Sequence, residues 1–479
     1  MDAVREVNVE SVDPRVLERI VAAARIEELL SNGDRLATAL GDASVICVNS
    51  TAAGGGVAEM LHVLLPYVRG AGIRTRWMTI EGDERFFAIT KRLHNHLYGT
   101  AGDRGTLDED EHDHYVATLQ DNAAQLATVV RPGDVVILHD PQTAGLAAAM
   151  RARGACVIWR CHVGTDVPSA HTEVGWRFLR RYLDPPAVHA YVFTHAAFAP
   201  RWIPPTLVHE IPPSIDPFSP KNRELSIEET QAILCSVGLV SGPHRGAAYQ
   251  RSDGTAARIE HGVDVVRTGP PPAIDVPLVV QVSRWDRLKD MAGVLRGFAD
   301  FVVRDHGAHL VLAGPVVTAV ADDPEAAEVM NECWAMWRRL PHHARMRIAL
   351  VCIPMTDLEE NAVIVNALQR HATVVVQKSL AEGFGLTVSE AMYKRRPVIG
   401  SAVGGITDQI VDGETGVLLR EPADLGAFAS ALGSMLDHPE RLAAMGDAGH
   451  RRVLDRFMPD AQLARWSALL RDLIEARAA

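Results

Sequence analysis

The strongest constraint on the fold is a repeated alternation of short apolar runs with helical patterns. In the first half of the chain, strand-like runs occupy 45–49 (VICVN), 75–80, 134–139, 156–161, 190–194 and 207–211. Helical patterns separate most of these runs, and a helical stretch at 14–40 precedes them. This order is typical of an α/β fold in which helices cover both faces of a parallel sheet.

The alternation stops at 212–275, a stretch rich in proline, glycine and serine around one helical piece, SIEETQAILCSV. It then begins again, with strand-like runs at 278–283, 309–314, 347–353, 372–377, 397–401 and 416–419 and helical patterns from 422 onward. A chain of 479 residues is also longer than one hydrophobic core usually supports. We therefore predict two sheets facing each other across a cleft, with ligands at the carboxyl ends of the strands. The predicted parts are a first α/β domain at 1–217, an insertion and linker at 218–275, a second α/β domain at 276–455, and a C-terminal helix at 456–479 that packs back on the first domain.

Composition excludes several classes of partner. The net charge of -12 gives no basic surface for nucleic acid or an anionic membrane. No window approaches the roughly 18 apolar residues of a membrane span, and the acidic N-terminus lacks a signal segment. The six cysteines are scattered without a Cys-x-x-Cys spacing, which favours free thiols in a reducing compartment over disulfides or a metal site. We expect a cytoplasmic enzyme.

The stretch SLAEGFGLTVSEAM, residues 379–392, is predicted to carry the chemistry. It follows the apolar run ATVVVQ and enters a helix, so that a strand, a glycine loop and a helix start succeed one another. Backbone N–H groups and the positive end of the helix dipole then converge on one point, which suits an anion. Glu382 lies in the loop and Glu390 in the helix, where the two carboxylates can contact different parts of one ligand.

A basic pair marks the start of the same domain. Arg284 and Lys289 lie in SRWDRLKD, directly after the strand LVVQVS. Two cations where the chain leaves a sheet can neutralise a diphosphate whose charge grows as it departs. An isolated pair of this kind is more often a solvated turn, but the helix start in the same domain favours an anion site.

Three loops of the first half follow predicted strands. Gly54, Gly55 and Gly56 allow a ligand to approach the backbone closely, although they match neither a dinucleotide fingerprint nor a P-loop. Asp140 and His162 end neighbouring strands and are expected side by side. By contrast, the acidic run LDEDEHDHY at 107–115 is predicted to be a solvated loop rather than a metal site.

Together these residues resemble a known family. Glu382 and Glu390, separated by seven residues, preceded by Arg284 and Lys289 and followed by PVIGSAVGGITDQIVDGETGVLL, resemble the retaining glycosyltransferases of the GT-B fold, which has two Rossmann-like domains. In the first half, NSTAAGGGVAEMLHVLLPYVRGAG, LHDPQTAG and WRCH are similar to the trehalose synthases that join a nucleotide-activated glucose to glucose. Fungal-type trehalose phosphorylases share much of this pattern.

The resemblance implies a role for each residue. Arg284 and Lys289 would hold the diphosphate of an ADP- or UDP-glucose donor, and Glu390 would accept hydrogen bonds from its ribose. The donor glucose and phosphate would be held by Glu382 and by the N–H groups of the next four residues, which are Gly383, Phe384, Gly385 and Leu386. His162 would contact the donor sugar near the reacting carbon, while Asp140 and the Gly54–Gly56 loop would shape the acceptor pocket. The resemblance thus makes 1–217 a Rossmann-like acceptor domain and 276–455 a Rossmann-like nucleotide-sugar domain. The acceptor pocket would add Glu81, Lys91, His94 and Asn95.

The reaction implied is transfer of glucose with retention to free glucose, forming trehalose without metal or cofactor. Relatives imply a homodimer. Three alternatives stay open: a trehalose phosphorylase that uses inorganic phosphate, a hydrolase with paired carboxylates, and a related transferase, pseudo-glycosyltransferase or non-catalytic binder with another acceptor. The sequence does not distinguish an ADP-, UDP- or GDP-linked donor.

Overall fold

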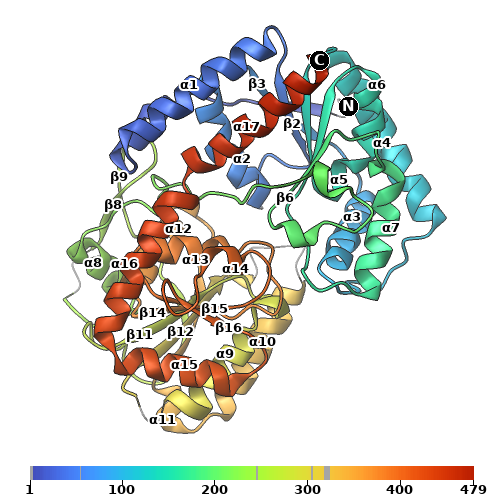
Figure 1. Ribbon diagram of the computed structural model, residues 1–479. Coiled ribbons are helices and arrows are strands. Elements are labelled where there is room, and N and C mark those ends of the chain that lie inside the picture. The colour runs from blue at the N-terminus through green and yellow to red at the C-terminus, as the bar shows by residue number, and fades with distance from the viewer. Residues whose placement is uncertain (1–3, 54–55, 244–245, 304–305, 318–323, 479) are drawn as a thin grey trace. The chain divides into compact units, whose positions relative to one another are not determined.

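The boundaries of helices and strands follow the apolar periodicity in both halves of the chain. The computed structural model describes residues 4–53, 56–243, 246–303, 306–317 and 324–478 (Figure 1). They form two compact units. Unit 1 consists of Met1–Ser214 and Arg456–Ala479, and unit 2 consists of Ile215–Asp455. Unit 1 is therefore discontinuous in sequence.

The sheet of unit 1 has seven strands in the order β1-β3-β2-β4-β5-β6-β7. Their bounds are β1 Val4–Val7, β2 Val45–Asn49, β3 Thr75–Ile80, β4 Val135–His139, β5 Cys156–Cys161, β6 Ala190–Phe193 and β7 Val208–Glu210. All neighbours are parallel except β1, which runs antiparallel to β3 at the edge. The predicted strands are confirmed. The edge strand was not predicted, because the four residues VREV are too few to show a period.

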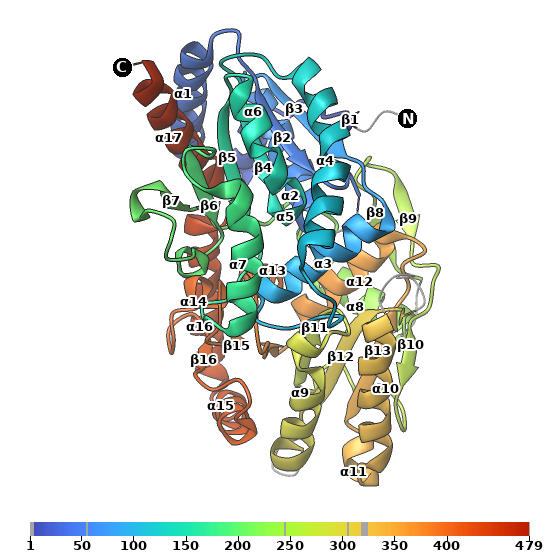
Figure 2. The ribbon, with the colours of Figure 1, turned by 90° about the vertical axis from the view of Figure 1, so that its right-hand side faces the viewer.

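Alternate residues of each strand face two different helical layers. Ile46 and Val48 of β2 pack in a core with Phe86, Tyr115 and Phe178. These three aromatic residues come from α3 (Glu84–Leu97), α4 (Glu109–Val129) and α7 (Ala170–Leu183), which Figure 2 shows together on one side of the sheet. The opposite face is covered by α1 (Ala23–Leu40), α2 (Gly56–Gly70) and α17 (Pro459–Ala478), and α17 packs along α1.

The acidic run at 107–115 belongs to a helix, so its prediction as a loop is wrong. Helix α4 begins at Glu109, and the Asp108 carboxylate accepts a hydrogen bond from the Glu111 N–H at 3.2 Å. Acidic side chains in a first turn interact favourably with the positive end of the helix dipole. The charge density that was taken as a mark of a loop is instead the capping signal of this helix.

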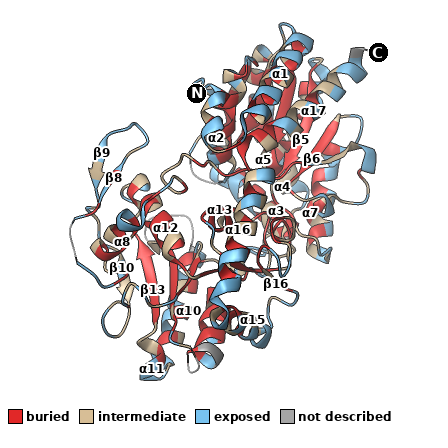
Figure 3. Cartoon of the chain, turned by 60° about the vertical axis from the view of Figure 1, so that its left-hand side comes forward, coloured by how far each residue is buried: buried red, intermediate tan, exposed pale blue. Residues whose placement is uncertain are grey.

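The sheet of unit 2 also has seven strands, in the order β10-β13-β12-β11-β14-β15-β16. Their bounds are β10 Asp264–Val266, β11 Leu278–Val282, β12 His309–Pro315, β13 Ile348–Ile353, β14 Val374–Gln377, β15 Val398–Ser401 and β16 Val417–Leu419. Only β10 is antiparallel to its neighbour. One face packs on a core with α9 (Met291–Gly297), α10 (Pro324–Arg339) and α15 (Leu425–Asp437), while α12 (Leu358–His371) and α13 (Leu386–Tyr393) also contact the sheet. Figure 3 shows buried strands in both units.

The segment between the two predicted sheets is largely structured. Helix α8 (Ile227–Ser236) packs on α12, strands β8 (Ala248–Gln250) and β9 (Ala256–Arg258) form a hairpin, and β10 adds an edge to the unit 2 sheet. This segment, from Ile215 onward, belongs to unit 2, which ends at Asp455. Within the described ranges, no helix has both the length and the hydropathy of a membrane span.

Candidate active site

Two loops meet at the centre of the unit 2 sheet, where the strand order reverses direction. Strands β11 and β14 are neighbours, and the chain proceeds from β11 to one side and from β14 to the other. Such a point opens space at the carboxyl ends of the strands and is the usual ligand position in open α/β sheets. The loops after β11 and β14 are joined by a backbone hydrogen bond from the Leu380 N–H to the Leu288 carbonyl, at 2.7 Å.

The shared centre of these loops is an ion pair between two predicted site residues. Lys289 Nζ donates to Glu382 Oε2 at 2.6 Å, and the same oxygen accepts from Ser379 Oγ at 3.0 Å. Gln377 Nε2 lies 3.4 Å from that oxygen. The Glu382 residue is only 9% exposed, and these donors fix the orientation of its carboxylate. A carboxylate held in this way can accept hydrogen bonds from a ligand without reorganising.

A second ion pair lies directly beside the first. Lys378, which is fully buried, pairs with Asp290. Asp290 also caps α9 by accepting from the Gly293 N–H at 3.1 Å, and its backbone is left-handed with a φ of 48°. Asp tolerates this conformation better than most residues. Lys289 and Asp290 are consecutive in the loop after β11, and their partners lie in the loop after β14. The two ion pairs therefore connect the same two loops at two points.

The helix start predicted after the glycine loop is present and carries no side-chain cap. Helix α13 begins at Leu386, and its N-cap is Gly385, whose φ of 80° favours glycine. The first N–H groups of such a helix are suited to bind an anion. Glu390 lies farther along α13, is 6% exposed, and has its Oε1 3.5 Å from Lys221 Nζ. Arg284 donates to Asp286 Oδ2 at 2.9 Å, and its side chain is 59% exposed.

Unit 1 has its own reversal point, between β2 and β4, and predicted residues gather beside it. Asp140 begins the short helix α5 (Asp140–Thr143) and has a φ of 61°. Its Oδ1 accepts from the His162 N–H at 2.7 Å. His139 Nδ1 lies 3.0 Å from His162 Nε2, and the two rings are stacked. The structure thus brings Asp140 and His162 together as the sequence predicted, and adds His139.

Burial controls the protonation of this group. It raises the pKa of Asp140 to about 7 and lowers the pKa of His139 to about 3. The pKa of His162 is also well below its ordinary value, first because of burial and then because of the positive Arg160. Both imidazoles are therefore neutral near pH 7. A neutral ring that touches a ligand acts through hydrogen bonds rather than through charge.

Of the predicted acceptor residues, three share one helix. Lys91, His94 and Asn95 lie on α3, and burial lowers the pKa of His94 to about 4. His94 is close enough to His162 to lower the pKa of that ring further. Glu81 instead pairs with Arg5 at 2.9 Å, with both side chains exposed.

The predicted glycine loop after β2 lies only partly within the described residues. Gly54 and Gly55 lie outside the described residues, and Gly56 is the first residue of α2.

The charged or titratable residues of these groups that were not predicted include His139, Lys221, Asp290 and Lys378. Two of them carried a signal. Lys378 follows the strand VVVQ without a break, and a cation at the end of a buried strand needs a partner. Asp290 directly follows Lys289 and begins a helix. Lys221 had no such signal, because its segment is irregular and rich in proline.

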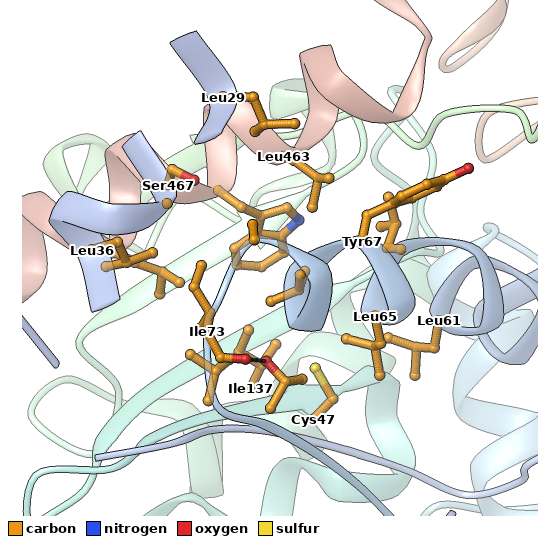
Figure 4. A pocket seen from close by; sticks show the side chains of 18 of the residues that line it. Leu29, Leu36, Cys47, Leu61, Leu65, Tyr67, Ile73, Ile137, Leu463 and Ser467 are labelled. Carbon is orange, nitrogen blue, oxygen red and sulfur yellow. Dashed lines mark hydrogen bonds between the residues drawn. The ribbon is translucent and has the colours of Figure 1, made fainter. Parts of the chain in front are cut away.

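A separate apolar cavity of ≈ 60 Å³ lies within unit 1, between the sheet and the layer of α1, α2 and α17 (Figure 4). Its lining includes Leu36 and Leu65 from the helices and Cys47 from β2. His139 also lines it, on the same face of β4 as Ile137. The cavity reaches β4 next to the residues described above.

Two sequence families match the chain. Residues 47–200 match the family "Trehalose synthase, N-terminal domain", and residues 358–452 match "Glycosyl transferases group 1". The first match spans β2 to η3 (Ala196–Phe198) of unit 1. The second spans α12, the loop after β14 and α13 in unit 2. The first match therefore includes the unit 1 group with Asp140 and His162. The second includes Glu382 and Glu390 but not Arg284 or Lys289.

Individual relatives extend over nearly the whole chain. A trehalose synthase of Pyrococcus horikoshii is 34% identical over 451 residues, which are 93% of this chain and 94% of that protein. One of Rubrobacter xylanophilus is 33% identical, over 90% of this chain and 91% of its own length. A trehalose phosphorylase of Pleurotus pulmonarius is 25% identical, over 87% of this chain and 55% of its own length.

Solved structures support the fold. An alpha,alpha-trehalose 6-phosphate synthase from Burkholderia multivorans matches with a TM-score of 0.64 at 15% identity, covering 91% of this chain and 98% of its own. A sucrose-phosphate synthase from Thermosynechococcus elongatus matches with a TM-score of 0.63 at 19% identity, covering 90% of this chain and 100% of its own. With two parallel-sheet units of this kind and 34% identity across 93% of its length, the chain belongs to the trehalose synthase family of GT-B glycosyltransferases.

Proposed function

We propose that the protein transfers glucose, with retention of configuration, from a nucleotide-diphosphate glucose to free glucose and so forms α,α-trehalose. The observation that carries this proposal is the similarity to trehalose synthases over almost the full length of both partners. The paired Lys289 and Glu382 beside an uncapped helix start support it, because they provide a cation, a carboxylate and backbone donors at one point. Such a set matches the charge and hydroxyl groups of a sugar diphosphate.

The proposed donor site is on unit 2. Lys289 keeps donor capacity beyond its bond to Glu382, since an ammonium has three N–H donors. With Arg284 it neutralises the diphosphate. Glu382 and the N–H groups of Gly383 to Leu386 hold the glucose hydroxyls and the phosphate. Glu390 accepts from the ribose.

On unit 1, the proposed contact with the donor falls to a neutral imidazole. His162 contacts the donor glucose near its reacting carbon, and Asp140 orients His162 through the N–H bond at 2.7 Å. The acceptor glucose lies against Asp140 and the α3 residues Lys91, His94 and Asn95, with Glu81 and the Gly54–Gly56 loop at its margin.

In the proposed step, the bond between the anomeric carbon and the diphosphate oxygen breaks while the acceptor hydroxyl attacks on the same face. The departing phosphate oxygen takes the acceptor proton, so no protein nucleophile is used. The protein contributes position and electrostatic stabilisation. Because Arg284 and Lys289 provide the positive charge, we propose that neither metal nor cofactor is required.

The test is product analysis after incubation with glucose and ADP-, UDP- or GDP-glucose, with and without a chelator. We expect α,α-trehalose and nucleoside diphosphate from at least one donor, at an unchanged rate with the chelator. Trehalose cleavage that requires inorganic phosphate would instead identify a phosphorylase, and cleavage to glucose without any donor would identify a hydrolase. We further propose a cytoplasmic homodimer, which light scattering would detect as twice the chain mass of 52.0 kDa.

A further inference from the structure

The segment 216–224 has an unexpected position in unit 2. It lies in an irregular, proline-containing stretch, yet side chains of α12 and α13 bind its backbone and its Asn222. Asn366 Nδ2 donates to the carbonyls of Pro220 at 3.0 Å and Arg223 at 2.9 Å. Arg370 donates to the Asn222 carbonyl at 3.0 Å, and Lys394 Nζ donates to Asn222 Oδ1 at 2.9 Å. Since Asn366, Asn222 and Lys394 are buried, this is a fixed connection rather than a loose linker.

The attachment of segment 216–224 determines where the side chain of Lys221 lies. Lys221 lies in the middle of the fixed segment, and its Nζ is 3.5 Å from Glu390 Oε1. Its side chain is 36% exposed, whereas that of Glu390 is 9% exposed. The ammonium is therefore beside the carboxylate and belongs to the more exposed side chain of the pair. Lys394, one helical turn after Glu390, is fully enclosed and donates to the Glu390 carbonyl at 3.3 Å, so it does not compete for a ligand.

The chemistry of this pair selects the group that it can bind. A carboxylate only accepts hydrogen bonds and an ammonium only donates them, whereas a hydroxyl does both. A phosphate in the same place would gain from Lys221 but would be repelled by Glu390. A hydroxyl can donate to Glu390 and accept from Lys221 without any such cost. The pair is thus suited to a sugar hydroxyl and unsuited to an anion.

We infer that Lys221 is a specificity-determining residue that, together with Glu390, binds a ribose hydroxyl of the donor nucleotide from both sides. The inference rests on the proposed function, which assigns Glu390 to the ribose. A site built to bond a hydroxyl discriminates against the analogue that lacks it, because the charged groups are then left without that partner. The consequence is selection of ribonucleotides over deoxyribonucleotides.

The experiment measures the binding of nucleoside diphosphates by calorimetry. The tightest of ADP, UDP and GDP is compared with its 2′-deoxy and 3′-deoxy analogues. For the unsubstituted protein, we expect at least one analogue to bind about tenfold or more weakly, the loss of roughly one hydrogen bond to a charged group. In Lys221→Met, we expect the parent nucleotide to weaken and the ratio between parent and analogue to fall to about threefold or less.

Three controls make the result specific. Arg420→Met removes an exposed cation of the same unit and should leave all affinities unchanged. Lys221→Arg keeps a donor and should keep part of the discrimination. In Glu390→Gln, replacing Lys221 should have a smaller effect than in the unsubstituted protein, because the two groups act on one hydroxyl. Unchanged melting temperatures would show that the variants are folded.

The possible failures are distinguishable. If the unsubstituted protein binds no nucleoside diphosphate, the proposed function is wrong. If it binds the nucleotide but does not distinguish the deoxy analogues, or if Lys221→Met distinguishes them equally well, only the role of Lys221 is wrong.

Discussion

Asp140 combines a left-handed backbone, a buried carboxylate and a bond to the N–H of a proposed site residue. Its folded-state pKa of about 7 is above the ordinary 3.8, so folding favours the protonated carboxyl. The stability that this shift contributes is present at low pH and is lost as the pH rises through 7. Asp140→Asn keeps the acceptor oxygen without the charge. At each pH, the melting temperature of the variant is compared with that of the unsubstituted protein. We expect this difference to shift in favour of the variant by about 3 °C or more between pH 5 and pH 8.

The measurement is a calorimetric scan of both proteins across that pH range. Asp134 provides a control, since its buried carboxylate accepts from the Ser44 and Arg131 N–H groups and its replacement by Asn removes a charge elsewhere in unit 1. An equal pH response in Asp134→Asn, or none in Asp140→Asn, would contradict the assignment.

The ion pair of Lys289 and Glu382 makes the two halves of the proposed donor site interdependent. Removing the carboxylate charge should free Lys289 for phosphate and remove a repulsive charge, while the donor glucose loses an acceptor. For Glu382→Gln, we expect nucleoside diphosphate to bind about three- to tenfold more tightly and turnover to fall about a hundredfold. Titration of the nucleotide and steady-state kinetics check both values. Glu414→Gln, at an exposed carboxylate of the same unit, should change neither. A parallel loss of affinity and turnover would refute this arrangement.

At the scale of single residues, the sequence predicted polar groups in the loops that follow strands, such as Arg284, Glu382 and His162. It could not predict Lys221, because the contact with Glu390 depends on hydrogen bonds from Asn366 and Lys394 that are far away in the chain. The pairing of Asp290 with Lys378 was missed for the same reason, since 88 positions separate the two residues.

Among the elements, the five-residue strand β2 has a different packing environment on each of its two faces. Val45 faces the apolar cavity, whereas Val48 packs in the filled core on the other face. Val45→Ile adds a methylene to empty space and should stabilise unit 1 by about 1 kcal/mol. Val48→Ile adds the same group to a packed core and should destabilise it by about 1–3 kcal/mol. Denaturant unfolding of both variants tests the cavity. If the free energy of unfolding rose in both variants, or fell in both, the two faces of β2 would be packed alike.

Strand prediction succeeded for the parallel strands of both sheets, including the short edge strands β7 and β16, and missed the two antiparallel edge strands. The central strands of both sheets were predicted from apolar runs. The antiparallel edge strands β1 and β10 have four and three residues, too few to establish a period, and depend on pairing with β3 and β13. The start of α4 was mistaken for a loop because acidic capping and solvation give the same composition.

For the whole molecule, the discontinuity of unit 1 has a measurable effect. Helix α17 supplies buried residues Leu463, Leu469 and Leu470 and packs along α1. Deleting residues after Asp455 should expose this layer and weaken unit 1 alone. By hydrogen exchange, we expect amides of β2 and β4 to lose protection while those of β11 and β12 keep it. Loss in both units, or in neither, would show that α17 is not the element that completes unit 1.

The same discontinuity sets an order of events on the ribosome. All of unit 2, Ile215–Asp455, is synthesised before the last helix of unit 1 exists. The first segment of unit 1 therefore stays incomplete, with its α1 and α2 layer uncovered, while the whole of unit 2 emerges and folds. The proposed donor site on unit 2 would thus fold before unit 1, which contains Asp140 and His162, is complete. During synthesis, we expect chaperones to contact the residues that were synthesised first rather than those that were synthesised last.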